Sequence, residues 1–407
     1  MMRTLDLQEH TRSGPVRLSS PERDALRAIP SLTIEPAPGE DSWYLTPGAT
    51  IGALELGDLS VSIRPKLEIS RVLFLGSYAM GEIDPREERF AFEEADTLVE
   101  TLAPALVSAA RRAFARGLLH GYPIEEEALH TVRGRILVAE QLRRRFDRPL
   151  PMEVRYDEFT EDIPANQLVK AAAVLLGQMR IRHAPSRAGL RWVGAMLDNV
   201  SRVSFPPKEV PVVQFDRLNE HYREAVTLSR LILQHTAFET DRGGLRAPGF
   251  LMDMNKVFQG FVTRALREEL GASELTFRSD DRTPRVTLDE DGHIRLKPDF
   301  SWWEGRTCTF VGDAKYKNIS GEREIPNADL YQLLAYTTAL DLPGGLLIYA
   351  QGEAAPAEYL VRHSGKRLEV VSLDLSGEIE DVLASIGGLA RRVRRLRDKA
   401  RRVARAA

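Results

Sequence analysis

Two acidic residues and a lysine fall in two short stretches of the sequence that one turn could bring together. Residues 296–300 (LKPDF) contain Asp299, and residues 311–317 (VGDAKYK) contain Asp313 and Lys315. Each stretch is typical of a short strand, and the spacing between the two acids leaves room for a single hairpin. Carboxylates are preferred ligands of Mg²⁺, a bound cation can activate water and neutralise a phosphate, and a lysine can stabilise developing charge. These residue types therefore favour metal-dependent hydrolysis of a phosphodiester.

A Pro-Asp pair followed by Asp-x-Lys is common by chance, so its surroundings matter. The alternative interpretation is two solvated strand ends with a surface ion pair between Asp313 and Lys315, which would contribute little stability. Residues 307–311 (TCTFV) are β-prone and lead directly into the second acid. A helix is predicted before the two strands, at 251–269, and another after them, at 327–340. This helix–strand–strand–helix order is the one expected for the core of a PD-(D/E)xK nuclease.

The later helix carries two polar residues that could serve the same site. Gln332 and Tyr336 are four positions apart and therefore share one face of a helix. Both could reach a nucleic-acid backbone or support Lys315. The alternative is that Tyr336 is a half-buried core aromatic and Gln332 merely its neighbour.

The composition is that of an ordinary soluble globular protein. Of the 407 residues, 43% are hydrophobic and 28% are charged, and the length suits two or three domains. The formal net charge of −3 gives no general attraction to nucleic acid, so contact with DNA would have to come from local patches. One such patch is residues 391–405 (RRVRRLRDKARRVAR), predicted either as a phosphate-binding helix near the nuclease face or as a solvated, partly frayed terminal helix.

Several other classes of protein are excluded or disfavoured. Cys308 is the only cysteine, so an intrachain disulfide is excluded and a cysteine-rich zinc site is not expected. The sequence contains no Gly-x₄-Gly-Lys-Ser/Thr phosphate loop, no HExxH zinc motif and no Gly-x-Ser-x-Gly elbow. The N-terminus lacks the apolar core of a signal peptide, and no apolar run is long enough to span a bilayer. We therefore expect a cytoplasmic protein without membrane contact.

Turn signals and hydrophobic periodicity divide the chain into four segments and predict a multidomain α+β fold. Residues 1–90 are predicted as a β-rich N-terminal domain, and residues 91–245 as a mainly helical central region. Residues 246–375 are predicted as an α/β domain of the PD-(D/E)xK, restriction-endonuclease-like type. Residues 376–407 are predicted as a basic helical tail.

Three local features of the middle of the chain are also predicted. A helix is expected at 92–117, and Pro104 inside it should cause a kink or a break. Residues 130–142 are expected to form a strand and then a helix. Residues 241–249 (DRGGLRAPG) are typical of a linker that precedes the α/β segment.

Many of these segments resemble McrC, the nuclease subunit of the McrBC-type, modification-dependent restriction systems. Together they cover roughly residues 30–350, so the resemblance is not limited to the nuclease motif. The matching segments are residues 52–67 with Pro65 and Lys66, Arg116 and Gly117 with Tyr122, residues 133–136 (RGRI), residues 156–160 (YDEFT) with Asp162 and Asn166, residues 254–258 (MNKVF), Pro298 and Asp299, residues 313–317 (DAKYK), and Gln332 with Tyr336.

The resemblance implies a division of labour between two kinds of chain. An N-terminal and central part would dock into the ring of an AAA+ GTPase or ATPase partner of McrB type and stimulate its hydrolysis. The partner would recognise modified double-stranded DNA and translocate it, and the C-terminal part of this chain would cut. The residues implied by match to the motif are Asp299, Asp313 and Ala314 for Mg²⁺ or Mn²⁺, Lys315 for the water, and Gln332 and Tyr336 for support of the site.

One further candidate site residue departs from the family pattern. Many members have a glutamate where Gln259 follows Phe258, and an amide lacks the charge to bind metal strongly. Asp253 or Glu268 of the same predicted helix could supply the missing acid. Without one, the alternative is a scaffold or activator of the partner's NTPase with a weak or inactive nuclease, and a free-standing nuclease is a third hypothesis. Exposed arginines such as Arg64 are candidates for stimulating the partner by charge alone.

Overall fold

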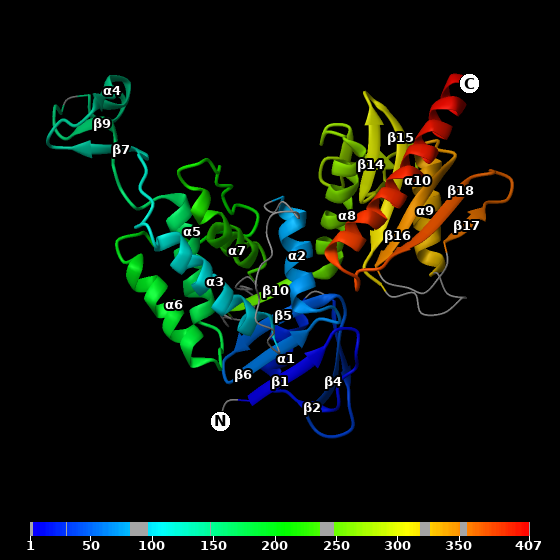
Figure 1. Ribbon diagram of the computed structural model, residues 1–407, viewed down its shortest axis with the longest axis horizontal. Coiled ribbons are helices and arrows are strands. Elements are labelled where there is room, and N and C mark those ends of the chain that lie inside the picture. The colour runs from blue at the N-terminus through cyan, green and yellow to red at the C-terminus, as the bar shows by residue number, and fades with distance from the viewer. Residues whose placement is uncertain are drawn as a thin grey trace.

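The computed structural model describes residues 3–29, 31–81, 97–146, 148–236, 248–317, 326–350 and 356–406. Figure 1 shows a β-rich part at the N-terminus, a helical part from which a small module projects, and a C-terminal part built on a mixed sheet. At this coarse level the fold is the multidomain mixture of helices and strands that the sequence predicts. Most of the predicted linker and the start of the helix predicted at 92–117 lie outside the described residues. No helix within these ranges is long and apolar enough to cross a membrane.

The N-terminal part contains two small sheets around one apolar core. The first has the strand order β1-β6-β5-β10 and the second the order β2-β4-β3. Leu59, Val61 and Ile63 alternate with polar residues along one strand and point into the core. The elements are β1 (Arg3–Gln8), β2 (Val16–Arg17), α1 (Ser20–Arg27), β3 (Leu32–Pro36), β4 (Ser42–Pro47), β5 (Thr50–Leu56), β6 (Leu59–Arg64) and β10 (Gly249–Asp253).

Strand β10 lies far along the sequence from the other strands of its sheet. It pairs antiparallel with β5, where Gly52 lies opposite Leu251. Gly52 has a φ of +130°, and a Cβ there would lie 2.0 Å from the carbonyl oxygen of Phe250, so this close pairing requires glycine. β10 runs directly into α8 (Met254–Leu270), and Asp253 caps that helix by accepting a hydrogen bond from the N–H of Asn255. The N-terminal sheet is therefore continuous with the first helix of the C-terminal part.

The helical part shows that Pro104 does not end its helix. It lies inside α3 (Leu98–Phe114), which continues for ten residues beyond the proline. Of the two predicted effects, a kink or a break, the break does not occur, because α3 buries Leu102 and Leu106 on either side of Pro104 and this packing offsets the hydrogen bond that proline removes. The other elements here are α2 (Ile69–Met80), α5 (Pro164–Gly177), α6 (Ala184–Met196), the 3₁₀ turn η1 (Glu220–Tyr222) and α7 (Arg223–Gln234).

A small module, residues 121–160, stands out from the helical part (Figure 1). We call it the projecting module. Its elements are β7 (Ile124–Leu129), β8 (Arg135–Ile136), α4 (Val138–Arg145) and β9 (Met152–Asp157), with the strand order β7-β9-β8. The predicted strand and helix at 130–142 are confirmed, whereas the three-stranded sheet was not foreseen in a region expected to be mainly helical.

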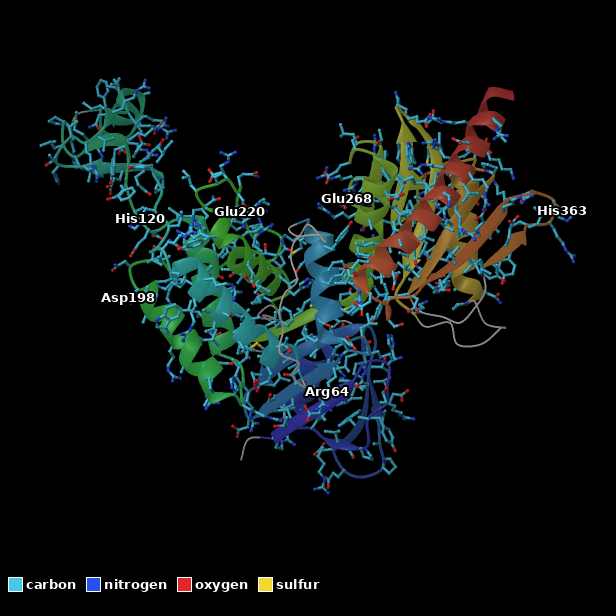
Figure 2. All side chains as sticks on the ribbon, viewed as in Figure 1. Arg64, His120, Asp198, Glu220, Glu268 and His363 are labelled. Carbon is cyan, nitrogen blue, oxygen red and sulfur yellow. The ribbon has the colours of Figure 1, made fainter. Side chains whose placement is uncertain are left out.

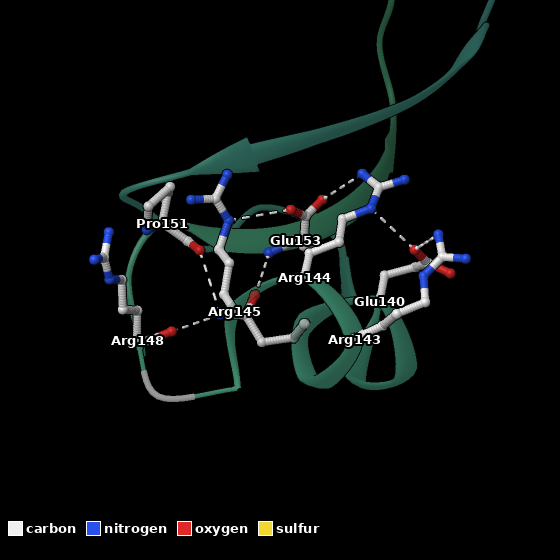
Figure 3. A network of polar contacts seen from close by, with 8 residues as sticks. Glu140, Arg143, Arg144, Arg145, Arg148, Pro151 and Glu153 are labelled. Atoms are coloured by element: carbon white, nitrogen blue, oxygen red, sulfur yellow. Dashed lines mark hydrogen bonds and ion pairs between the residues drawn. The ribbon is translucent and has the colours of Figure 1, made fainter.

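A buried acid holds the helix of the projecting module on its sheet. Glu153 of β9 is buried and pairs with Arg144 (3.3 Å) and Arg145 (3.2 Å) of α4, and Arg143 and Arg144 also pair with Glu140 on the same helix (Figure 3). Because Glu153 carries an uncompensated charge without these arginines, the pairs fix where α4 lies on the sheet. The three consecutive arginines, Arg143 to Arg145, therefore serve partly to hold the fold of the module together.

The C-terminal part is a six-stranded mixed sheet with helices on both faces. Its strand order is β11-β14-β15-β16-β18-β17; β14 and β15 are antiparallel, while β15, β16 and β18 run parallel. α8 and α10 share a core with Ala314 and Tyr316, whereas α9 shares a core with Val311 and Leu347. The elements are β11 (Phe277–Ser279), β12 (Val286–Thr287), β13 (Arg295–Leu296), β14 (Phe300–Glu304), β15 (Thr307–Lys315), α9 (Asn327–Ala339), β16 (Gly344–Ala350), β17 (Ala357–Leu360), β18 (Arg367–Leu373) and α10 (Ile379–Ala406).

The basic segment 391–405 belongs to α10, which lies along the sheet (Figure 1). Val393, Leu396 and Ala400 are buried and α10 contacts α8 and β15, whereas Val403 near the end is 49% exposed, so a helix that is solvated along its whole length is wrong. Arg392 and Arg395 pair with the buried Glu369 of β18, and Arg401 pairs with Glu304. α10 also packs on the face of the sheet that lies opposite α9. Some of the arginines of α10 therefore hold the helix on the sheet.

Candidate metal site at the end of the mixed sheet

The acids and the lysine of the predicted motif meet where β14 begins and β15 ends. The register that places Phe300 opposite Gly312 brings Asp299, directly before β14, beside Asp313. Side chains alternate along a strand, so Asp313 and Lys315 share the face of Val311, which packs toward α9. Figure 1 shows α9 along β16. The pairing of two neighbouring strands thus builds the site that their spacing predicts.

Asp299 and Asp313 form a carboxyl pair in which Asp313 is buried and Asp299 is half-buried. The N–H of Ala314 donates a hydrogen bond to Asp299 Oδ2 at 2.8 Å. Burial and then the charge of Asp313 raise the pKa of Asp299 to about 8. Burial also raises the pKa of Asp313, although Lys315 beside it acts in the opposite direction. Two like charges this close disfavour each other, so the pair keeps a proton near neutral pH unless a cation replaces it.

Lys315 is held from two sides. Its Nζ lies 2.5 Å from Asp313 Oδ2 and donates to Gln332 Oε1 at 2.9 Å. Burial alone would lower the pKa of Lys315, but the carboxylate of Asp313 outweighs burial and the pKa is raised. The lysine is therefore a protonated, oriented cation rather than a general base.

Gln332 and Tyr336 extend this chain of hydrogen bonds. Gln332 Nε2 lies 2.6 Å from the hydroxyl of Tyr336, which donates to the carbonyl of Lys297 at 3.0 Å. Tyr336 is buried, and burial followed by the charges of Asp313 and Asp299 raises its pKa. The structure thus connects Gln332 and Tyr336 to Lys315. Both alternatives raised for Tyr336 apply, since it is a core aromatic and also a partner of the site.

Gln259 is not joined to this group. It lies on α8, whose Phe258 contacts the ring of Tyr316 (centroids 6.3 Å apart), on the face of the sheet opposite α9. Gln259 is half-buried, and over the described ranges no hydrogen bond or ion pair links it to Asp299, Asp313 or Lys315.

The acids named as substitutes for a glutamate at 259 have other partners. Asp253 caps α8 through the N–H of Asn255. Glu268, labelled in Figure 2, pairs with Arg264 at 2.7 Å and accepts a hydrogen bond from Tyr78. The acids whose charges act on Lys315 are therefore Asp313, Asp299 and Asp329, and none of them lies on α8.

A second polar group beside the site was not predicted. Asp329, one turn before Gln332 in α9, is buried and accepts hydrogen bonds from Tyr349 Oη at 2.7 Å and from Lys317 Nζ at 3.2 Å. The signal was present in the sequence, because positions 329, 332 and 336 lie on one face of a helix. Tyr349 gave no signal, since it sits in a uniformly apolar strand.

The carboxyl pair has the donors that a divalent cation requires. Asp313 is only 1% exposed, yet within the described part of the chain its Oδ1 has no hydrogen-bond partner. A buried carboxylate oxygen without a partner is costly, and an oxygen-preferring cation such as Mg²⁺ or Mn²⁺ would satisfy it. The residues therefore fit such a cation.

Another acidic group, Asp289, Asp291 and His293, lies in the exposed turn between β12 and β13. The oxygens of Asp289 accept hydrogen bonds from the N–H groups of His293 (2.9 Å) and Ile294 (2.7 Å). These bonds shape the turn, so Asp289 needs no cation to satisfy its charge.

The central motifs of the sequence build the projecting module and its stem. Arg133 lies over the ring of Tyr156, with its Cζ 4.2 Å from the ring centroid. Gly134 has a φ of +69°, and a Cβ there would lie 2.4 Å from the carbonyl oxygen of Arg155. These residues therefore hold the turn before β8 against β9.

The stem is fixed to the helical part by two polar side chains. Asn166 is buried in α5 and donates to the carbonyls of Leu119 (2.8 Å) and Glu161 (2.7 Å), one on each of the two segments that connect the module to the helical part. Asp162 accepts hydrogen bonds from the N–H (2.9 Å) and hydroxyl (2.5 Å) of Ser201. His120, at the base of the module in Figure 2, stacks on Phe159. The motifs at 156–166 thus set the direction of the projecting module.

Fold and site together define a protein of several parts in which a carboxyl pair, with a protonated lysine beside it, can hold a divalent cation. A sequence model of the McrBC 5-methylcytosine restriction system component matches residues 45–350, well over half of the chain. The chain belongs to this family, as an McrC-type member.

Two known proteins illustrate the relationship. The type IV methyl-directed restriction enzyme EcoKMcrBC of Escherichia coli (strain K12) is 20% identical over 307 residues, which are 72% of this chain and 88% of that protein. A solved chain from a half-complex of the tetradecameric assembly of Thermococcus gammatolerans McrB AAA+ hexamers with bound McrC is 17% identical. It superimposes with a TM-score of 0.56 over 95% of this chain and 99% of its own length, so the fold is shared from end to end.

Proposed function

We propose that this chain is the Mg²⁺-dependent DNA endonuclease subunit of an McrBC-like type IV restriction system, a form of antiphage defence in the cytoplasm. It would act with an AAA+ GTPase of McrB type, stimulate that partner, and cut modified double-stranded DNA. The observation that carries the proposal is the carboxyl pair of Asp299 and Asp313 beside Lys315, in a chain of this family. Its C-terminal part would be a PD-(D/E)xK nuclease domain.

The residues of the site would divide the work as follows. Asp299, Asp313 and the main chain at Ala314 would hold Mg²⁺ or Mn²⁺. A cation held there would polarise the phosphate and lower the pKa of a bound water. Lys315 carries a fixed positive charge and would stabilise charge on the phosphate or orient the water. Gln332 keeps the ammonium of Lys315 in place, and Tyr336 keeps Gln332 in place.

The projecting module is the part we propose to dock on the partner. Val138 and Leu142 of α4 and Phe146, which caps its C-terminus, lie four positions apart and are 62%, 53% and 85% exposed, so they form an apolar stripe in contact with water. Such a stripe is typical of an interaction surface. The name of the related assembly, in which McrB hexamers bind McrC, supports an AAA+ ring as the partner.

One observation favours a second candidate function. Gln259 cannot supply charge to a cation, and within the described part of the chain it makes no hydrogen bond to Asp299 or Asp313. The alternative is therefore a scaffold or activator of the AAA+ NTPase with a weak or inactive nuclease.

The two functions separate in one experiment. The chain is coexpressed with its AAA+ partner, and cleavage of methylated DNA is measured with Mg²⁺ and GTP or ATP for wild type and Asp313→Ala. The nuclease proposal predicts cleavage that requires both the partner and Asp313, with stimulation of the partner's nucleotide hydrolysis unchanged in the variant. Stimulation without cleavage in the wild type would favour the activator, and cleavage without the partner would indicate a free-standing nuclease.

A further inference from the structure

Beside the candidate metal site lies a second lysine that the proposed mechanism does not use. Lys317 Nζ lies 3.3 Å and 3.2 Å from the two oxygens of Asp329. The same carboxylate accepts a hydrogen bond from the hydroxyl of Tyr349, which is fully buried. Asp329 is itself buried. Its carboxylate therefore has one buried partner, Tyr349, and one partner nearer the surface, Lys317.

The backbone keeps Lys317 next to Lys315. Directly after β15 the chain makes a tight turn in which the N–H of Lys317 donates to the carbonyl of Lys315 at 2.9 Å. The residue at the apex, Tyr316, is buried on the other face of the sheet, and its hydroxyl donates to the buried Glu9 of the N-terminal part at 3.1 Å. The anchored apex fixes the direction of the turn, so both lysines are presented at the same end of the sheet.

The face of α9 repeats this arrangement. Asp329 and Gln332 are three positions apart and share one helix face, and each holds one lysine: Asp329 holds Lys317, and Gln332 holds Lys315. Two ammonium groups, two residues apart in the chain, are thus positioned by one helix.

The outer lysine is open to a further partner. The side chain of Lys317 is 48% exposed, whereas that of Lys315 is 20% exposed. An ammonium has three N–H donors, so Lys317 can contact a phosphate while it keeps its ion pair with Asp329. The hydrogen bond from Tyr349 holds the carboxylate of Asp329 in place, and the carboxylate in turn orients the lysine.

We propose that Lys317 binds the backbone phosphate next to the one that is cut, and that Asp329 is its positioning residue. This inference rests on the proposed nuclease function, because it assigns a substrate contact to the same site. Lys317 makes a point contact without base recognition, so the contact is independent of sequence.

Salt dependence of DNA binding tests the contact without requiring cleavage. Binding of a methylated duplex by the complex with the AAA+ partner is measured over a range of salt, in EDTA, for wild type and Lys317→Ala. Each phosphate contact contributes about 0.9 to the slope of log K against log salt. We expect the slope to fall by about that amount in Lys317→Ala, with equal effects on duplexes of different sequence.

The matched control is Arg306→Ala. Arg306 is an exposed cation in the turn at the opposite end of β15, nine residues from Lys315 and so about 30 Å away. It should leave the slope unchanged. An unchanged slope in Lys317→Ala, or an equal loss in Arg306→Ala, would overturn the proposal.

Kinetics distinguish the contact from the chemistry. Lys317→Ala should raise the DNA concentration for half-maximal cleavage about tenfold and leave the maximal rate within about twofold, because it removes binding rather than transition-state stabilisation. A lower maximal rate with unchanged half-saturation would contradict the inference. If no variant cleaves, including wild type, the nuclease proposal fails, while the salt slope still decides whether Lys317 contacts DNA.

The role of Asp329 is tested by a double-mutant cycle. Asp329→Asn preserves size and should weaken DNA binding, whereas adding it to Lys317→Ala should weaken binding no further. Additive losses would show that Asp329 acts independently of Lys317 and would contradict its positioning role.

Discussion

At the scale of single residues, the carboxyl pair decides how the site responds to pH. Asp299 is half-buried beside the buried Asp313, and the pKa of Asp299 is raised from 3.8 to about 8. The folded, metal-free protein therefore keeps a proton that the unfolded chain would release. A bound cation must displace this proton, so metal affinity should rise with pH up to about pH 8.

The stability of the metal-free protein should reflect the same proton. A raised acid pKa contributes stability that is complete below pH 4 and is lost as pH rises through about 8. Asp299→Asn, which imitates the neutral acid, should therefore melt higher than wild type at pH 8.5 and about equally at pH 5. Thermal melts in EDTA at the two pH values measure this. A difference that is the same at both would contradict the shared proton.

At the scale of elements, the close pairing of β14 with β15 creates the site. Gly312 lies opposite Phe300, and a Cβ there would lie 2.2 Å from Phe300 Cε2 and 2.9 Å from the carbonyl oxygen of Leu346. The strand next to the acids therefore tolerates no side chain at this position, and its register depends on that glycine.

Gly312→Ala should destabilise the protein by about 1–3 kcal/mol, because either Phe300 or the strand must move. Chemical denaturation provides the measurement. Gly194→Ala in α6 is the control: among the described residues no heavy atom lies within 4 Å of the added Cβ, so the change should be neutral or stabilising by up to about 1 kcal/mol. Equal stability of the two variants would show that the strands adjust without cost.

The local sequence pattern predicts the strands and the helix that carry the site, but not every element that packs beside them. The strands around Asp299 and Asp313, and the shared face of Gln332 and Tyr336, follow from short-range alternation and helical spacing, which the residues themselves encode. The pairing of β10 with β5 could not be predicted, because it depends on a contact between residues about two hundred positions apart.

The position of Gln259 could not be predicted either. Helical spacing indicates which face of α8 it occupies, but only packing decides on which side of the sheet the whole helix lies. The same holds for α10. Its basic sequence favours a solvated helix, but its apolar residues pack against the sheet, and that packing cannot be predicted from the local sequence.

At the scale of the whole molecule, the projecting module and the candidate metal site belong to different parts. The module stands at the end of a stem on the helical part, whereas the carboxyl pair lies in the C-terminal sheet (Figure 1). Docking and chemistry should therefore be separable by mutation, provided that the shared core between the parts remains intact.

Phe146→Ser, combined with Leu142→Ser, should reduce stimulation of the partner's nucleotide hydrolysis at least tenfold, because it removes the exposed apolar stripe of α4. Stability should change little, since both side chains are in contact with water. Leu360→Ser in β17 removes a similarly exposed leucine, 67% exposed, and should have no effect. Normal stimulation by the α4 variant would exclude this stripe as the docking surface.

The central claim is that Asp299 and Asp313 bind a divalent cation, and calorimetric titration with Mn²⁺ tests it most directly. Wild type should bind with release of a proton at pH 7, and Asp313→Asn should lose at least tenfold in affinity. Asp289→Asn, in the acidic turn between β12 and β13, should bind as wild type does. Equal Mn²⁺ affinity in wild type and Asp313→Asn, or a loss confined to Asp289→Asn, would contradict the account.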